Sequence, residues 1–154
     1  MAEIKSPNPI PETGEMKIFL AGSIEMDTAE HWQEKAAQAL RDEPVLLFNP
    51  RREYWDTQLE QSKHAKEFKQ QVEWELNALA MSDYIVMYFD PKTKSSISLL
   101  ELGLYAQSGK LLVVCAAGFW RKGNVDIVCE KYKIPQFASL AELLVHVREL
   151  IETK

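Results

Sequence analysis

Short apolar runs alternate with longer segments of helical period along most of this chain. Apolar runs of strand length lie at 17–21, 45–48, 84–89 and 111–115. Helical periodicity extends over about 27–41, over a segment that ends near residue 81, and over 99–108, 124–133 and 141–153. Strands that are apolar on both faces and alternate with helices are typical of a parallel sheet covered on both sides. The pattern therefore predicts a three-layer α/β fold in which a β-α unit recurs about five times.

The first fifteen residues depart from this pattern. They contain Pro7, Pro9 and Pro11, show no periodicity and include few large apolar side chains. We expect a flexible or extended leader over residues 1–15, followed by a single α/β domain over residues 16–154. At this length a hydrophobic core needs no support from disulfides or metals.

Charge and composition narrow the class of partner. Acidic residues outnumber basic ones by 23 to 18, whereas nucleic-acid-binding surfaces are built from clustered Lys and Arg. We therefore expect small molecules or other proteins as partners, and no nucleic acid. No apolar run is long enough for a membrane span, and residues 1–15 lack a signal core, which predicts a cytoplasmic protein without a membrane partner. Cys115 and Cys129 have no further Cys or His at metal-ligand spacing, which predicts two buried thiols and no metal site.

Candidate chemistry is expected in the loops after the strands, because parallel α/β sheets bind ligands beyond the carboxyl ends of their strands. The run 17–21 leads into Gly22 and Ser23, a small turn that leaves backbone N–H groups free for an oxygen-rich ligand. The alternative is a simple tight connection, because the turn lacks the other glycines of a dinucleotide fingerprint and the Lys of a P-loop.

The loop after 45–48 combines cations with aromatic side chains. Arg51 and Arg52 are followed by Tyr54 and Trp55. Such a group can hold an anion or a carbonyl and can stack on a base. A surface loop with solvated arginines explains the same residues.

Glu75 interrupts the apolar face of the helix that ends near residue 81. That face is formed by Phe68, Val72, Leu76 and Leu79. Glu75 falls on it and is predicted to face inward, whereas Glu73 is predicted to face solvent. A buried carboxylate is costly unless it is paired or has a task. Glu75 is therefore a functional candidate, and the alternative is a structural bond to Arg52 or to a backbone N–H.

Glu101 follows the 84–89 strand, beyond Asp90 and a serine-rich loop that includes Ser95. Ser98 and Glu101 have the spacing of an N-terminal capping box, which is one interpretation. The other gives Glu101 a chemical role in the first turn of a helix at the carboxyl end of a central strand. Glu75 and Glu101 would then meet at one edge of the sheet, and a carboxylate pair is what retaining glycosyl chemistry uses.

Four short motifs together resemble a known family. They are Phe19-Leu20-Ala21-Gly22-Ser23-Ile24, Glu75 eight residues before Asp83-Tyr84-Ile85-Val86, Leu100-Glu101-Leu102-Gly103, and Gly123-Asn124-Val125. Over about residues 16–145 the chain is similar to the nucleoside 2-deoxyribosyltransferase superfamily, which includes nucleoside 5'-monophosphate N-glycosidases. The resemblance implies a flavodoxin-like (Rossmann-like) fold. It also implies a homodimer or higher homo-oligomer with sites shared between subunits.

The resemblance further implies roles for individual residues. Glu101 would be the nucleophile that forms a glycosyl-enzyme intermediate at C1', and Glu75 would stand in place of the family's second acid, which is usually Asp. Gly22 and Ser23 would line the sugar site, and Asn124 would contact the sugar or the catalytic carboxylate. The remaining candidates for substrate binding are Phe19, Arg51, Arg52, Trp55, Asp90 and Ser95.

Departures from the family pattern bear on the choice between transferase and hydrolase. Phe19 stands where the transferases have a Tyr, and Ser95 stands where the nucleotide hydrolases have a phosphate-binding Ser, so both favour a hydrolase. Glu25 stands where hydrolases often have Arg. Ile97 and Leu99 replace small residues of the loop before the nucleophile, and these changes oppose a phosphate site of the usual kind.

The sequence therefore predicts an enzyme that cleaves the N-glycosidic bond of a (deoxy)nucleoside or nucleotide. The sugar would pass to another free base or to water, with neither a metal nor an organic cofactor. One alternative is a nucleotide-binding or sensing module of the same fold without turnover, because Ile97 and Leu99 would narrow the sugar pocket. A flavodoxin-like redox protein is disfavoured, because the turn at Gly22 lacks the Ser- and Thr-rich loop that holds the FMN phosphate.

Overall fold

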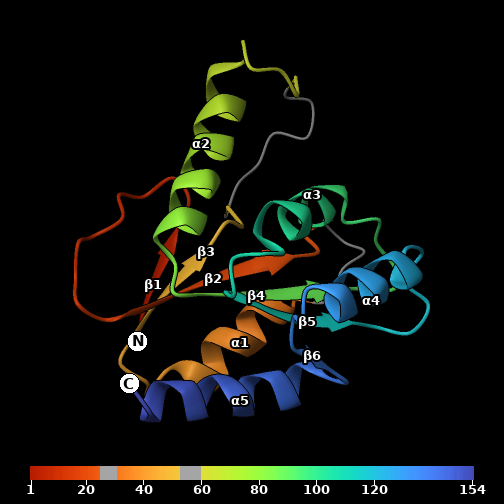
Figure 1. Cartoon of the computed structure of the whole chain (residues 1–154). Helices are drawn as coiled ribbons and strands as arrows, with labels where there is room; N and C mark the ends of the chain where they lie inside the picture. The colour runs from red at the N-terminus through yellow and green to blue at the C-terminus, as the bar shows by residue number, and fades with distance from the viewer. Residues whose placement is uncertain (25–30, 53–59) are drawn as a thin grey trace.

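A computed structural model of the chain describes residues 1–24, 31–52 and 60–154 (Figure 1). Their strands form one sheet of six parallel strands in the order β1-β3-β2-β4-β5-β6. The strands are β1 (Ala2–Lys5), β2 (Met16–Gly22), β3 (Val45–Asn49), β4 (Tyr84–Phe89), β5 (Leu111–Cys115) and β6 (Gln136–Phe137). From β3 to β6 this is the flavodoxin-like order, in which the direction of winding reverses between β2 and β4. The predicted α/β fold class is confirmed.

Helices cover both faces of the sheet (Figure 1). They are α1 (Trp32–Leu40), α2 (Lys66–Met81), α3 (Ser96–Tyr105), α4 (Lys122–Lys131) and α5 (Leu140–Glu152). One hydrophobic core lies between the sheet and α2, α3 and α4, and the other lies between the sheet and α1 and α5. β2 to β5 are buried on both faces, which is why each of them reads as a nearly continuous apolar run. None of the described helices is both long enough and apolar enough to cross a membrane.

The N-terminal segment differs from the expectation of a leader outside the fold. Ala2–Lys5 forms β1, which pairs in parallel with β3 at the end of the sheet. Ile4 in this strand and Ile10 beyond it pack against the core that α2, α3 and α4 cover. The indole N–H of Trp74 donates to the carbonyl of Asn8 over 2.8 Å. The prolines hide this arrangement in the sequence because they interrupt periodicity. A four-residue edge strand nevertheless needs only one partner.

Candidate active site

The strands β2 and β4 approach each other closely at their carboxyl ends. Gly22 has a φ of +134°, and a Cβ atom on it would lie 2.3 Å from the carbonyl oxygen of Tyr88. Any side chain here would therefore push the two strands apart. The Gly22 turn is a tight connection, and it sets Ser23 directly beside the end of β4, where Ser23 N–H donates to the Tyr88 carbonyl over 3.0 Å.

Three buried hydroxyl groups meet at this end of the sheet. Ser23 Oγ lies 2.8 Å from Thr93 Oγ1 and 2.6 Å from Ser95 Oγ, and the latter two atoms are 2.7 Å apart. The backbone N–H of Asp90 donates to Ser23 Oγ over 2.9 Å, so the hydroxyl cluster of Ser23, Thr93 and Ser95 ties the β2 turn to the loop after β4. Asp90 itself is buried, and its carboxylate accepts the N–H of Lys92 over 2.8 Å. Sequence reasoning missed Thr93, whose only signal is its place between Asp90 and Ser95.

The start of α3 differs from both interpretations of the serine-rich loop. The helix begins at Ser96, and Ser95 before it has a left-handed backbone with φ of 48°. This turn directs the chain into the helix earlier than expected. Ser98 is therefore an intrahelical residue, and the capping-box interpretation is wrong. Glu101 lies in the second turn of α3, where it is buried with 8% of its surface exposed.

Glu75 approaches the site from α2. The buried face of this helix consists of Gln71, Trp74, Ala78 and Leu79. It is rotated from the predicted face, because the Trp74 ring packs between Phe19 and Phe48 while Leu76 is left 47% exposed. Glu75 is half-buried at the border of this face, and Glu73 faces solvent as predicted.

The polar partners of Glu75 come from its own helix and from the loop after β3. The side-chain amide of Gln71 donates from Nε2 to Glu75 Oε1 over 2.8 Å. Arg52 is nearby, donates from Nε to Gln71 Oε1, and lies 3.6 Å from a carboxylate oxygen of Glu67. Sequence reasoning missed Gln71, although its position four residues before Glu75 places both on one helix face.

Glu75 lies close enough to Glu101 to affect the ionisation of the Glu101 carboxyl. Burial raises the pKa of Glu75, and the Gln71 hydrogen bond and the Arg52 charge offset only part of this effect. Burial and then the neighbouring Glu75 carboxylate raise the pKa of Glu101 to about 8. The described structure thus brings together the two carboxylates singled out in the sequence, and at neutral pH the pair retains a proton.

The remaining candidate residues have different surroundings. Phe19 is buried in the core against Trp74. Arg51 is half-buried, with Nη1 3.4 Å from Gln33 Oε1, and lies on the α1 side of the sheet edge. Asn124 is exposed on α4, and among the described residues no hydrogen bond joins it to either carboxylate. Trp55 and Glu25 lie outside the described residues.

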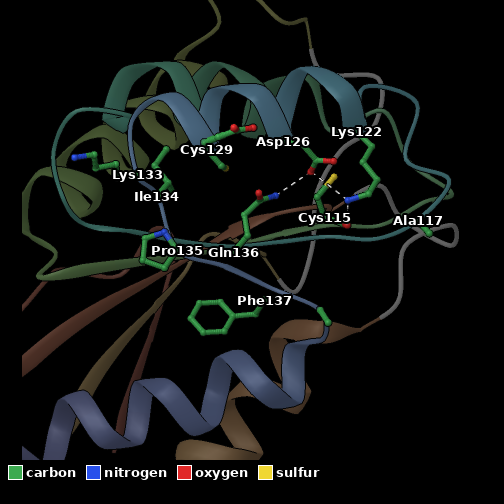
Figure 2. Close-up of a pocket in the computed structure, with 12 residues that line it drawn as sticks. Cys115, Ala117, Lys122, Asp126, Cys129, Lys133, Ile134, Pro135, Gln136 and Phe137 are labelled. Atoms are coloured by element: carbon green, nitrogen blue, oxygen red, sulfur yellow. Dashed lines mark hydrogen bonds and ion pairs between the residues drawn. The ribbon is translucent and has the colours of Figure 1, made fainter.

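A separate open groove of about 890 Å³ lies between α4 and the strands β5 and β6 (Figure 2). Lys122 Nζ donates to the Cys115 carbonyl and to Asp126 Oδ1, each over 3.1 Å, and Gln136 Nε2 donates to the same carboxylate oxygen over 2.9 Å. The thiols of Cys115 and Cys129 are both buried, as predicted. Burial raises their pKa values to about 11 and about 12, so both stay protonated and unreactive at neutral pH.

Within the three described ranges, the structure shows no cluster of three or more His, Cys, Asp or Glu side chains placed to hold a metal ion. The polar groups described above are the carboxylate pair, the Gln71 amide, the Arg52 guanidinium and the hydroxyl cluster. These groups can exchange protons, attack an electrophilic carbon and accept or donate hydrogen bonds to hydroxyl or phosphate oxygens.

Comparison with known families matches more than half of the chain to one family. A family model described as nucleoside 2-deoxyribosyltransferase like matches residues 15–119. The matched region runs from the residue before β2 into the loop after β5, and so contains Glu75 and Glu101 but not β1. No curated protein shows a significant match to the chain.

Proposed function

The chain belongs to the nucleoside 2-deoxyribosyltransferase-like family, and we propose that it cleaves the N-glycosidic bond of a nucleoside or nucleotide through a covalent glycosyl intermediate. The observation that supports this most directly is the pairing of the half-buried Glu75 with the buried Glu101, whose pKa is raised to about 8 by burial and then by the neighbouring Glu75 carboxylate. Two adjacent carboxylates that share a proton can supply a nucleophile and an acid together.

The raised pKa of Glu101 places the single proton of the pair on that residue at neutral pH. In the first step, this proton passes to Glu75 when the substrate binds, so that Glu101 is ionised. A carboxylate oxygen of Glu101 attacks C1' of the sugar and forms an ester bond. The electron pair of the breaking C1'–N bond passes to the base, which takes the proton from Glu75 as it leaves.

In the second step, water or another base attacks C1' and releases Glu101 as a carboxylate. The ionised Glu75 takes the proton of the attacking group, which restores the pair. With water the reaction is a hydrolysis, and with an acceptor base it is a glycosyl transfer. Neither step uses a metal or an organic cofactor.

We assign the sugar, or its 5'-phosphate, to the side of the hydroxyl cluster. Ser95 lies at the start of α3 and Ser23 lies directly after β2, and their hydroxyl groups are 2.6 Å apart. Arg51 and Arg52 lie in the loop after β3, and we assign the base to that side. Trp55 follows them in the sequence and is proposed as a stacking partner for the base. Asn124 is proposed as a contact to a sugar held on a neighbouring copy, because it is exposed in this chain.

A binding module without turnover is less well supported. In such a module Ile97 would narrow the sugar pocket, yet Ile97 is 59% exposed on α3. Leu99 is half-buried and packs against the core under α2, α3 and α4.

We also propose that the chain forms a homo-oligomer through α3. Ile97, Leu100 and Leu104 recur on one side of this helix and are each more than half exposed, which is unusual for large apolar side chains on a lone surface helix. A second copy is the proposed occupant, as the family resemblance implies. Light scattering should show wild type as a dimer or larger and Leu100→Lys as a monomer, with Val145→Lys on α5 as the matched control. A monomeric wild type would contradict this proposal.

The activity itself is tested by measuring base release by HPLC. The substrates are ribo- and deoxynucleosides and their 5'-monophosphates, each with and without a second base, and Glu101→Ala is the blank. Release by wild type alone supports the proposal, and dependence on the second base separates transfer from hydrolysis. If wild type releases no base from any of them while ligands still raise its melting temperature, the binding module takes its place.

A further inference from the structure

The orientation of the Gln71 side-chain amide is determined by its partners. The Nε–H of Arg52 can only donate, and it meets Gln71 Oε1, whereas the carbonyl of Pro50 can only accept, and it lies 2.9 Å from Gln71 Nε2. A reversed amide would place its N–H groups against the Arg52 N–H and its oxygen against the Pro50 carbonyl, so this orientation is excluded. With one N–H on Pro50, the remaining N–H of Nε2 donates to Glu75 Oε1 over 2.8 Å.

The fourth bond of this amide comes from the N-terminal segment. Ser6 Oγ donates to Gln71 Oε1 over 2.5 Å, so both lone pairs and both protons of the amide are used. Ser6 and Gln71 are both buried. Ser6 follows β1 directly, and its backbone N–H donates to the Asn49 carbonyl over 3.2 Å, which extends the pairing of β1 with β3. Residues 1–14, which precede the matched family region, thus contribute a side chain to the support of a site carboxylate.

We propose that Gln71 is a positioning residue that holds the Glu75 carboxylate in its orientation toward Glu101, and that Ser6 fixes Gln71 in this role. The proposal rests on the proposed function of the carboxylate pair. Charged groups reach Glu75 from each packed element: Arg52 from the loop after β3, Glu101 from α3, and Glu67 on α2 through its ion pair with Arg52. Of the neutral side chains described, Gln71 is the one that donates to Glu75.

A donor to a carboxylate favours its ionised form, so removal of the Gln71 N–H raises the pKa of Glu75. Gln71→Met keeps the length and helix preference of the side chain but has no amide. In this variant we expect the pKa of Glu75 to rise by about one unit. The doubly protonated pair, which has no nucleophile, then persists to higher pH. The acid limb of the pH profile of kcat/KM should move upward by the same amount, so that kcat/KM falls by up to about tenfold on that limb and stays unchanged at pH values above it.

Two measurements test the proposal separately from the activity. The first is an NMR titration of ¹³C-labelled glutamate carboxyl groups in the ligand-free protein, with Glu75 assigned through the spectrum of Glu75→Gln. The second is the pH profile of base release. Gln38→Met on the exposed side of α1 is the matched control for Gln71→Met, and Ser108→Ala is the matched control for Ser6→Ala. Ser6→Ala should shift the Glu75 titration in the same direction as Gln71→Met, by a smaller amount.

The outcomes are distinct. A Glu75 titration that is the same in wild type, Gln71→Met and Ser6→Ala overturns the positioning role, whatever the activity. Lower activity with an unmoved acid limb also overturns it, because a loss of folded protein alone lowers the profile without shifting it. If wild type has no activity on any substrate, the proposed function fails, and the titration still decides whether Gln71 governs Glu75. If Gln71→Met does not fold, the Ser6→Ala titration makes the decision.

Discussion

Two carboxylates of this molecule accept a hydrogen bond from a glutamine amide, and their pKa values move in opposite directions. In the groove of Figure 2, partial burial raises the pKa of Asp126, but the bonds from Gln136 and Lys122 and the Lys122 charge outweigh it, so the pKa is lowered. At the switch point, burial dominates over Gln71 and Arg52, and the pKa of Glu75 is raised. Glu75 also lies near a second acid, Glu101, whereas the charge that acts on Asp126 is that of Lys122.

The difference separates a structural carboxylate from one available for chemistry. Asp126 has a cation in direct contact at 3.1 Å and remains ionised. At Glu75 and Glu101, hydrogen bonds and nearby cations do not offset the effect of burial on the pKa. The pair therefore holds a proton that it can give up when a ligand binds. A neighbouring amide and a neighbouring cation therefore do not by themselves determine whether a carboxylate keeps a proton. Burial and the like-charged neighbour decide which carboxylate is reactive.

The largest expected effect comes from Glu101→Gln. The amide keeps the shape of the side chain but neither ionises nor attacks C1', so base release should fall by about a thousandfold or more. Asp126→Asn, the same type of change in the groove, should leave the rate within about twofold of wild type. HPLC of released base checks both, with circular dichroism to confirm folding. Comparable losses in the two variants would contradict a catalytic role for Glu101 and a structural role for Asp126.

Glu75→Gln should lower base release by about a hundredfold, because the departing base then lacks its proton donor. A substrate whose leaving group needs no proton, such as a 4-nitrophenyl 2-deoxyriboside, should recover most of this loss. The ratio of the two rates is the measurement. An equal loss on both substrates would show that Glu75 is not the acid.

The stability of Glu101→Gln should depend on pH relative to wild type. The pKa of Glu101 is about 8 in the folded protein and its ordinary value is 4.5, so the folded state binds the extra proton between these values. Wild type has this favourable contribution in full below pH 4.5 and loses it as the pH rises through about 8. Wild type should therefore lose a few kcal/mol of unfolding free energy between pH 5 and pH 9 that Glu101→Gln does not lose, so the stability of the variant rises relative to wild type over this range. Urea unfolding at both pH values measures the gain, and a constant difference would contradict it.

The smallest effect is expected in the groove. Asp126→Asn removes a lowered-pKa carboxylate whose side chain is 42% exposed, so solvent screening limits the loss of stability at pH 7 to about 1 kcal/mol or less. The sign is opposite to that for Glu101, because the contribution of Asp126 is present above its ordinary pKa and is lost as the pH falls. Urea unfolding at pH 7 and pH 3 should show the loss only at pH 7.

Much of the fold could be predicted from periodicity. The strands β4 and β5 have the predicted bounds, because both of their faces are buried and their apolar runs are unbroken. The helix α2 ends at the predicted residue. β1 and β6 could not be found in this way. β1 has four residues on a sheet edge and β6 has two, so neither forms a run long enough to recognise.

The two acids of the site could be predicted from the sequence, but the residues that hold them in place could not. Glu75 stood out by its conflict with an apolar face, although Trp74 rather than Leu76 defines that face, because the wide indole ring fills the space beside Phe19. The left-handed backbone of Ser95 shifted the start of α3, and no local pattern signals such a conformation in a serine. The bonds of Gln71 join residues that are 19 and 65 positions away in the chain, a relation that only the tertiary structure provides.

The pairing of β1 with β3 also has a consequence for aggregation. All five residues of β3 are buried, and β1 covers the outer edge of this strand with a segment that includes Glu3 and Lys5. A fragment trimmed to the matched family region would expose the N–H and C=O groups along that edge. Unpaired, flat and apolar edges are templates for pairing between molecules. Such a fragment should therefore precipitate or form fibres, while the full chain, with its charged edge strand, stays dispersed.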